Sequence, residues 1–240
     1  MPFTFSHPAI ILPLSYLPKK WISLTALIVG SLTPDFEYFL RMKVQSIYSH
    51  TLSGIFWFDL PLGIIITFLF HTIIRNTLFL NLPLQIKARL FQYQKFDWIN
   101  YFKFNWIIVI ISLLIGITSH LFWDSFTHNH GYFVENIPSL KNKINLYNLQ
   151  IPIFKILQHS SSLIGGIIII LGFRKLPISK IENTEINFKY WLILIITTLM
   201  IILVRFLTGL TFYQYGTIII TIISATLIGL IVTPILINKL

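Results

Sequence analysis

The sequence contains no cysteine and few charged residues. None of its 240 residues is cysteine, which excludes disulfides, cysteine-ligated zinc and a cysteine nucleophile. Only 11% are charged and 55% are hydrophobic, whereas soluble domains carry about 25% charged residues. A soluble chain this apolar would expose large adhesive patches. The composition therefore predicts an integral membrane protein with no sizeable soluble domain.

Acidic residues are scarce relative to basic ones. Asp and Glu number 8 against 18 Lys and Arg, which gives a net charge of +10. On a soluble protein this excess would favour nucleic-acid binding. Here many of the basic residues gather at 75–105 and 174–190, between apolar runs, as in the cytoplasmic loops of membrane proteins. We therefore expect a lipid bilayer as partner and no nucleic acid.

Five segments are long and apolar enough to cross a bilayer, which takes about 20 residues. They are residues 54–74, 106–126, 153–173, 191–210 and 217–237. The N-terminal region instead holds two shorter apolar runs at 8–17 and 21–32. They predict a short helical hairpin that dips into the bilayer, with a single span over 21–40 as the alternative. The expected fold is an all-α polytopic membrane helical bundle: five full spans plus a short N-terminal helical hairpin.

The basic loops also predict the orientation of the chain. Lys and Arg favour the cytoplasmic side, so residues 75–105 and 174–190 should lie inside and residues 128–152 outside. The C-terminal Lys239-Leu240 then falls inside. No linker or repeat divides the sequence. We therefore predict one integral membrane domain over residues 1–240, multi-pass in the cell membrane, with a cytoplasmic C-terminus.

Three ionisable side chains recur every four residues at the outer end of the span at 106–126. His120, Asp124 and His128 lie within about an 80° arc of a helix, because each step of four advances by about 400°. Ionisable groups in a membrane are costly and are therefore functional candidates. Two imidazoles and a carboxylate can hold a divalent metal, with zinc the first candidate. A hydrogen-bonded polar stripe between helices is the alternative.

The predicted topology brings further ionisable residues to the same membrane face. Some lie at the two ends of the N-terminal hairpin. One lies just before the span at 54–74, and one lies near the start of the span at 153–173. With the stripe, the candidate metal ligands are His7, Asp35, His50, His120, Asp124, His128 and His159. Glu37 has a longer side chain than Asp35 and is the candidate catalytic residue, as general base. Its alternative role is an ion pair with Arg41, four residues later on the same helical face.

Several short motifs together resemble one family. They are FTFSHP at 3–8, GSLTPDFEY at 30–38, SHTLSG at 49–54, SHLFWDSFTH at 119–128 and LQHSS at 157–161. In combination they resemble domain-of-unknown-function family 4184, uncharacterised bacterial membrane proteins, over almost the whole chain. More distantly, the His, Pro-Asp, His-Thr and His-x-x-x-Asp elements resemble bacterial inner-membrane proteins named membrane-bound metal-dependent hydrolases. Glu37 stands where that second pattern has its second Asp.

The distant resemblance implies a hydrolase of the bacterial inner membrane. With the predicted topology, its metal site lies at the extracytoplasmic face, where a lipid, lipid-linked or phosphoester substrate is expected. A transporter or proton or cation relay is the alternative from another class, because intramembrane His and Asp chains also move ions. A non-catalytic membrane scaffold is the third reading. Retention of metal separates the hydrolase from the scaffold, and flux in proteoliposomes separates it from the transporter.

Overall fold

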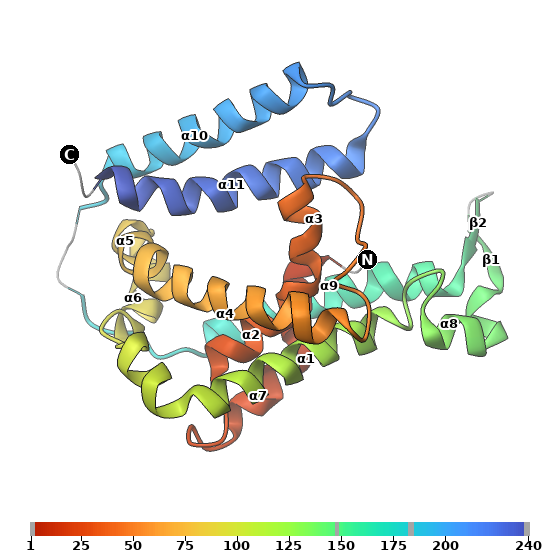
Figure 1. The fold of residues 1–240 in the computed structure, drawn as a ribbon, viewed down its shortest axis with the longest axis horizontal. Coiled ribbons are helices and arrows are strands. Elements are labelled where there is room, and N and C mark those ends of the chain that lie inside the picture. The colour runs from red at the N-terminus through yellow and green to blue at the C-terminus, as the bar shows by residue number, and fades with distance from the viewer. Residues whose placement is uncertain (1–2, 147–148, 182–184, 238–240) are drawn as a thin grey trace. The chain divides into compact units, whose positions relative to one another are not determined.

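Long apolar helices dominate the structure, a computed structural model that describes residues 3–146, 149–181 and 185–237 (Figure 1). Within this part of the chain, five helices are long and apolar enough to cross a membrane. They are Ile55–Asn81, Trp98–Asp124, Ile153–Arg174, Phe188–Leu207 and Tyr215–Ile237. The predicted all-α polytopic membrane fold is therefore confirmed, and each predicted span overlaps one of these helices. The lipid bilayer follows as the partner of a multi-pass protein.

Contacts divide the chain into two compact units. The first comprises Met1–Pro34, Tyr48–Ile64 and Asn105–Lys175. The second comprises Asp35–Ile47, Ile65–Phe104 and Leu176–Leu240. Both draw on separate stretches of sequence, and the single domain over residues 1–240 stays a prediction. Lys239 and Leu240, which the topology places inside, lie outside the described residues.

Short helices form the N-terminal region, as expected for a hairpin. Helix α1 (Pro8–Ile11) runs into a 3-10 turn, and α2 (Leu24–Leu32) follows after the connecting segment and contacts α1. Proline at the first position of α1 costs no hydrogen bond there. The alternative, one unbroken span over 21–40, does not form. A 3-10 turn at Thr33–Asp35 separates α2 from α3 (Phe36–Arg41).

The first unit is built further from α7 and α9. Helix α7 (Trp98–Asp124) begins before the predicted start at 106 and is kinked at Asn105, where φ is −129° and ψ is 22°. The chain then forms, in order, α8 (Tyr132–Asn136), a 3-10 turn (Pro138–Lys141), strands β1 (Lys143–Leu146) and β2 (Leu149–Pro152), and α9 (Ile153–Arg174). The two strands pair antiparallel, with Ile144 opposite Ile151. This small hairpin replaces part of the loop expected at 128–152.

The second unit contains the C-terminal helices. Its other helical elements are α3, part of α4 (Leu60–Leu69), a π-helical turn (Phe70–Ile74), α5 (Arg75–Asn81) and α6 (Leu84–Leu90). Helices α10 (Phe188–Leu207) and α11 (Tyr215–Ile237) lie side by side as an antiparallel pair (Figure 1). A Cβ on Gly229 of α11 would lie 2.9 Å from Leu194 of α10, so this pair packs closely.

Candidate metal centre

Asp124, the last residue of α7, is surrounded by histidines. One of its carboxylate oxygens lies 3.5 Å from His7 Nε2. The other lies 3.4 Å from His50 Nε2, 3.3 Å from His120 Nε2 and 3.6 Å from His128 Nδ1. The side chains of His7 and His120 are fully buried, whereas those of His50 and His128 are 21% and 29% exposed. The cluster therefore has a closed inner side and a partly open outer side.

These separations are those of neighbouring metal ligands rather than of hydrogen bonds. An N–H···O bond spans about 2.7–3.2 Å. In a tetrahedral zinc site with bonds of about 2.1 Å, adjacent ligand atoms lie about 3.4 Å apart. Neither carboxylate oxygen of Asp124 has a hydrogen-bond partner among the described residues. A divalent cation shared with the imidazoles around it could satisfy this buried carboxylate.

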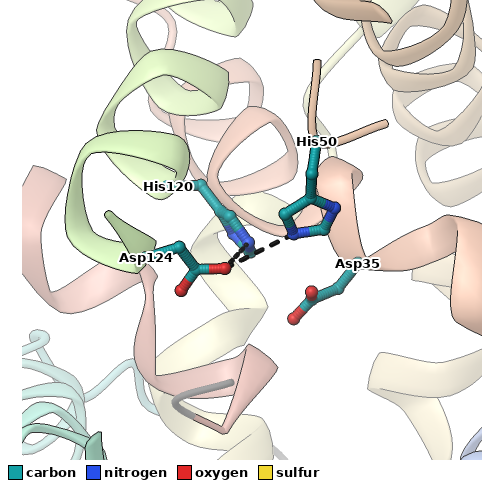
Figure 2. Close-up of side chains that lie close together, drawn as sticks. All are labelled: Asp35, His50, His120 and Asp124. Atoms are coloured by element: carbon teal, nitrogen blue, oxygen red, sulfur yellow. Dashed lines mark ion pairs between the residues drawn. The ribbon is translucent and has the colours of Figure 1, made fainter. Parts of the chain in front are cut away.

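Four of the described side chains form a set of possible metal ligands. Asp35, His50, His120 and Asp124 each offer one ligand atom, and the four atoms lie within 4.8 Å of one another. Figure 2 shows His50 and His120 directed at the Asp124 carboxylate, with the Asp35 carboxylate close by. Asp35 is the first residue of the second unit and is bonded to Pro34 of the first. A buried set of two imidazoles and two carboxylates could hold a divalent metal.

His120 is held in the orientation that a metal ligand needs. Its Nδ1 lies 2.7 Å from the carbonyl oxygen of Ser31 in α2. A carbonyl only accepts, so Nδ1 carries a proton, and in the neutral ring Nε2 then keeps its lone pair, as metal binding requires. A hydrogen bond from the other ring nitrogen to a carbonyl is the usual support of a metal-binding histidine, because it fixes the tautomer and the ring plane.

Two glycines make this support possible. A Cβ on Gly116 of α7 would lie 2.4 Å from the carbonyl oxygen of Leu27, and one on Gly30 of α2 would lie 2.3 Å from that of Leu113. The two helix backbones are therefore closer than any larger residue allows. This close crossing brings the carbonyl of α2 within reach of His120.

His7 is placed by contacts between the N-terminal segment and α9. The Ser6 hydroxyl donates to the Ser162 carbonyl at 2.8 Å. A Cβ on Gly165 would lie 2.9 Å from the Ser6 carbonyl oxygen, so the segment lies directly on the helix. The His7 ring then stacks on that of His120, with centroids 3.7 Å apart and ring planes 16° apart.

A tight turn carries His50. The Thr51 hydroxyl donates to the Tyr48 carbonyl at 2.7 Å and accepts from the Gly54 amide at 2.9 Å. The Ser49 hydroxyl lies 3.0 Å from His50 Nδ1. This contact engages one ring nitrogen, and the other, Nε2, faces the Asp124 carboxylate.

His128 extends the stripe by one turn beyond the end of α7. Its backbone N–H donates to the Asp124 carbonyl at 3.0 Å, and its Nδ1 lies 3.0 Å from the same oxygen. Burial lowers the pKa of the His128 imidazole, which favours the neutral form. The predicted shared face of His120, Asp124 and His128 is thus what forms. His128 borders the set formed by Asp35, His50, His120 and Asp124, and its own role as a ligand stays a prediction.

A comparison with known protein families places the chain. A model of a domain of unknown function, DUF4184, matches residues 1–235. The chain belongs to this family. No curated protein and no solved structure matches it. The match confirms the resemblance to family 4184 that the motifs indicated. The more distant resemblance to membrane-bound metal-dependent hydrolases stays a prediction.

Two predicted site residues of this DUF4184 chain lie in other settings. The side chain of His159 on α9 is exposed, and in the described part of the chain it forms no hydrogen bond or ion pair with Asp124. Glu37 is buried, and its Oε1 accepts from Arg41 Nε at 2.8 Å and from the Ile47 amide at 3.0 Å. The ion pair with Arg41 is the contact expected in the alternative role. The ligand role of His159 and the base role of Glu37 stay predictions.

A periodic pattern in the sequence also indicates the residues that support the site. Ser112, Gly116, His120 and Asp124 recur every four residues, so the polar stripe continues inward along α7 as small side chains. Ser112 accepts a hydrogen bond from the Ser23 amide at 2.9 Å, and Gly116 admits the α2 backbone. A stripe that turns from small to ionisable side chains indicates both the helix crossing and the site at its end.

Proposed function

We propose that this DUF4184 protein is a metal-dependent hydrolase of the bacterial cell membrane. The observation that carries the proposal is the set Asp35, His50, His120 and Asp124, whose ligand atoms lie within 4.8 Å of one another. Mixed imidazole and carboxylate donors suit zinc and other divalent ions of the first transition row. Zinc is the first candidate because catalytic zinc sites commonly combine these donors.

The buried and the partly exposed side chains of the site would have different roles. His120, with its Nδ1 on the Ser31 carbonyl, and the stacked His7 would form the rigid inner wall of the site. The partly exposed His50 and His128 would border the side from which a substrate enters. A divalent ion, when bound, supplies Lewis acidity that lowers the pKa of water to about 7 and polarises the scissile group.

The position along α7 favours a lipid or phosphoester substrate. Asp124 is the last residue of a helix long enough to cross the membrane. A site at the end of a span lies near headgroup depth, where the scissile bonds of phospholipids and lipid-linked phosphates are found. The predicted topology places this end on the extracytoplasmic face.

Loss of metal in a double variant tests the proposal. Purified wild-type protein should hold about one divalent ion per chain by elemental analysis, and His120→Ala/Asp124→Ala should hold almost none. Removal of two ligands from a buried set leaves too few donors for tight binding. Hydrolysis of a soluble phosphodiester and of short-chain phospholipids should fall in parallel in the double variant. Added zinc should restore hydrolysis to chelator-treated wild-type protein but not to the double variant.

A second His and carboxylate pair supplies the control. His130 and Glu135 also lie 3.6 Å apart, but their side chains are 89% and 47% exposed. His130→Ala/Glu135→Ala should therefore keep the metal and the activity. Stoichiometric metal that survives in His120→Ala/Asp124→Ala would contradict the assignment. Flux of protons or cations in proteoliposomes, without hydrolysis, would favour the relay.

A further inference from the structure

A cavity of about 570 Å³ adjoins the histidine cluster. His128, which borders Asp124, lines it together with its neighbours Thr127 and Asn129. The other lining residues come from the 3-10 turn before β1, from the ends of the strand pair and from the first turns of α9. All of them belong to the first unit. The cavity and the histidine cluster therefore meet at His128, within the first unit.

The wall of the cavity is strongly cationic. Lys141, Lys143 and Lys155 line it, and no acidic side chain does so among the described residues. Lys141 is ion-paired with Glu135, and Lys155 Nζ donates to Gln158 Oε1 at 2.7 Å. Only one of the three ammonium groups thus has a described carboxylate partner. The ammonium groups of Lys143 and Lys155 therefore give the cavity a positive electrostatic potential.

The start of α9 adds to that potential. Lys155 lies in the first turn of this 22-residue helix, and that turn contains no acidic residue. The N-terminus of a helix carries about half a positive charge, so a lysine there is unfavourable by itself. An anion bound in the cavity would be attracted both by the Lys155 ammonium group and by the helix N-terminus. An anionic ligand would therefore be favourable at this end of the cavity.

The size and lining of the cavity indicate an organic anion. Small-molecule sites commonly measure about 300–1,000 Å³, and a bare tetrahedral oxyanion would leave most of this space empty. Pro152 and Phe154 supply apolar surface beside the lysines. We propose that the cavity binds the phosphate of an organic phosphate ester, with Lys143 and Lys155 as the partners of the anion. The inference rests on the proposed function, because it names the substrate class of the adjacent hydrolytic centre.

Binding to chelator-treated protein tests the subsite separately from the metal. Dihexanoyl phosphatidic acid, inorganic phosphate and dihexanoylglycerol are titrated into detergent-solubilised protein by calorimetry. Phosphatidic acid should bind, the neutral diacylglycerol should not, and inorganic phosphate should bind at least tenfold more weakly. Lys143→Gln/Lys155→Gln should raise the Kd for phosphatidic acid at least tenfold, because charge-assisted contacts are lost. Lys143→Arg/Lys155→Arg should restore it to within about threefold.

Lys19 and Lys20 provide a matched control, because both are exposed in the first unit and do not line the cavity. Lys19→Gln/Lys20→Gln removes the same charge and should leave the Kd unchanged. Equal weakening in both glutamine variants, or no binding by the wild type, overturns the subsite. Equal affinity for inorganic phosphate and phosphatidic acid would contradict the proposal that the ligand is an organic phosphate ester. If the wild-type protein binds the anion but contains no metal, the subsite is supported and the proposed hydrolase function is contradicted.

Discussion

Asp124 combines two unfavourable features for a carboxylate. Its side chain is only 6% exposed, and burial of a charge without compensation is costly. It also ends α7, where the helix dipole is negative and disfavours an anion. The imidazoles of His7, His50 and His120 surround it, but a neutral imidazole donates one proton, which in His120 is directed to Ser31. A shared divalent cation would offset both features at once.

Glu37 is the residue whose role can be separated most sharply by one substitution. Its Oε1 accepts from Arg41 and the Ile47 amide, and Ser46 Oγ lies 3.2 Å from its Oε2. We expect Glu37→Gln to keep its metal and to lose about 1–3 kcal/mol of stability, because a buried charge-assisted contact is removed. Its turnover then separates the general base from the ion-pair role. Elemental analysis, thermal unfolding and turnover are measured on the same preparation.

Arg41→Gln is the partner variant, because it breaks the same ion pair and leaves the Glu37 carboxylate in place. If Glu37 only anchors this segment, both variants should be destabilised to a similar extent with turnover retained. Near-complete loss of turnover in Glu37→Gln alone, with metal intact, would establish the general base. Loss of the metal in Glu37→Gln would make it a ligand instead.

At the scale of elements, length and hydropathy were sufficient to find the five spans. The boundaries were less predictable. Residues 98–105 precede the apolar run and contain polar side chains, yet they form the first turns of α7 up to the kink at Asn105. The strand pair was missed because each strand has four residues, and two short strands give too weak an alternation to recognise.

The candidate site was predictable only where its residues share an element. The four-residue spacing brought His120, Asp124 and His128 together within one helix. His7, His50 and Asp35 come from separate segments, and only the assumed topology linked them to the stripe. Their placement depends on backbone approaches at Gly165, Gly30 and Gly116. Such approaches are properties of packed helix pairs and leave no periodic signal in the sequence.

Adjacent glycines in α9 allow this packing to be tested. A Cβ on Gly165 would meet the Ser6 carbonyl at 2.9 Å, whereas one on Gly166 meets nothing within 4 Å. Gly166→Ala should be neutral or stabilise by about 0.5–1 kcal/mol, because alanine favours a helix. Gly165→Ala should not be stabilised in this way and should lower the free energy of unfolding by about 1–3 kcal/mol, because its Cβ overpacks the contact. It should also weaken metal binding, because it displaces His7. Thermal unfolding with and without added zinc measures both effects.

Retained stability and metal affinity in Gly165→Ala would show that the N-terminal segment is not held against α9 as described. His7→Ala separates the two consequences. It should lower the metal affinity without the overpacking cost, since it leaves the Ser6 backbone and its contact with Ser162 in place. If His7→Ala leaves the metal affinity unchanged, His7 supports the ring of His120 but takes no part in binding the ion.

At the scale of the whole molecule, the membrane class follows from composition, because a chain with mean hydropathy +0.77 and 11% charged residues cannot cover itself with polar surface. The direction of insertion depends on a different property, the position of the basic residues. Residues 75–105 contain Arg75, Lys87, Arg89, Lys95 and Lys103. Segments this basic are retained in the cytoplasm, which predicts that the histidine cluster and the lysine-lined cavity face outward.

The absence of cysteine makes the orientation directly measurable, because any introduced thiol is the only one. Lys95 and Asn142 are both exposed and lie on opposite sides in the predicted topology. A membrane-impermeant maleimide applied to intact cells should label Asn142→Cys and leave Lys95→Cys unreacted. After lysis both should react, which controls for accessibility within the fold. The reverse pattern in intact cells would place the cluster on the cytoplasmic side, and its substrate would then have to be sought among inner-leaflet lipids and cytoplasmic phosphoesters.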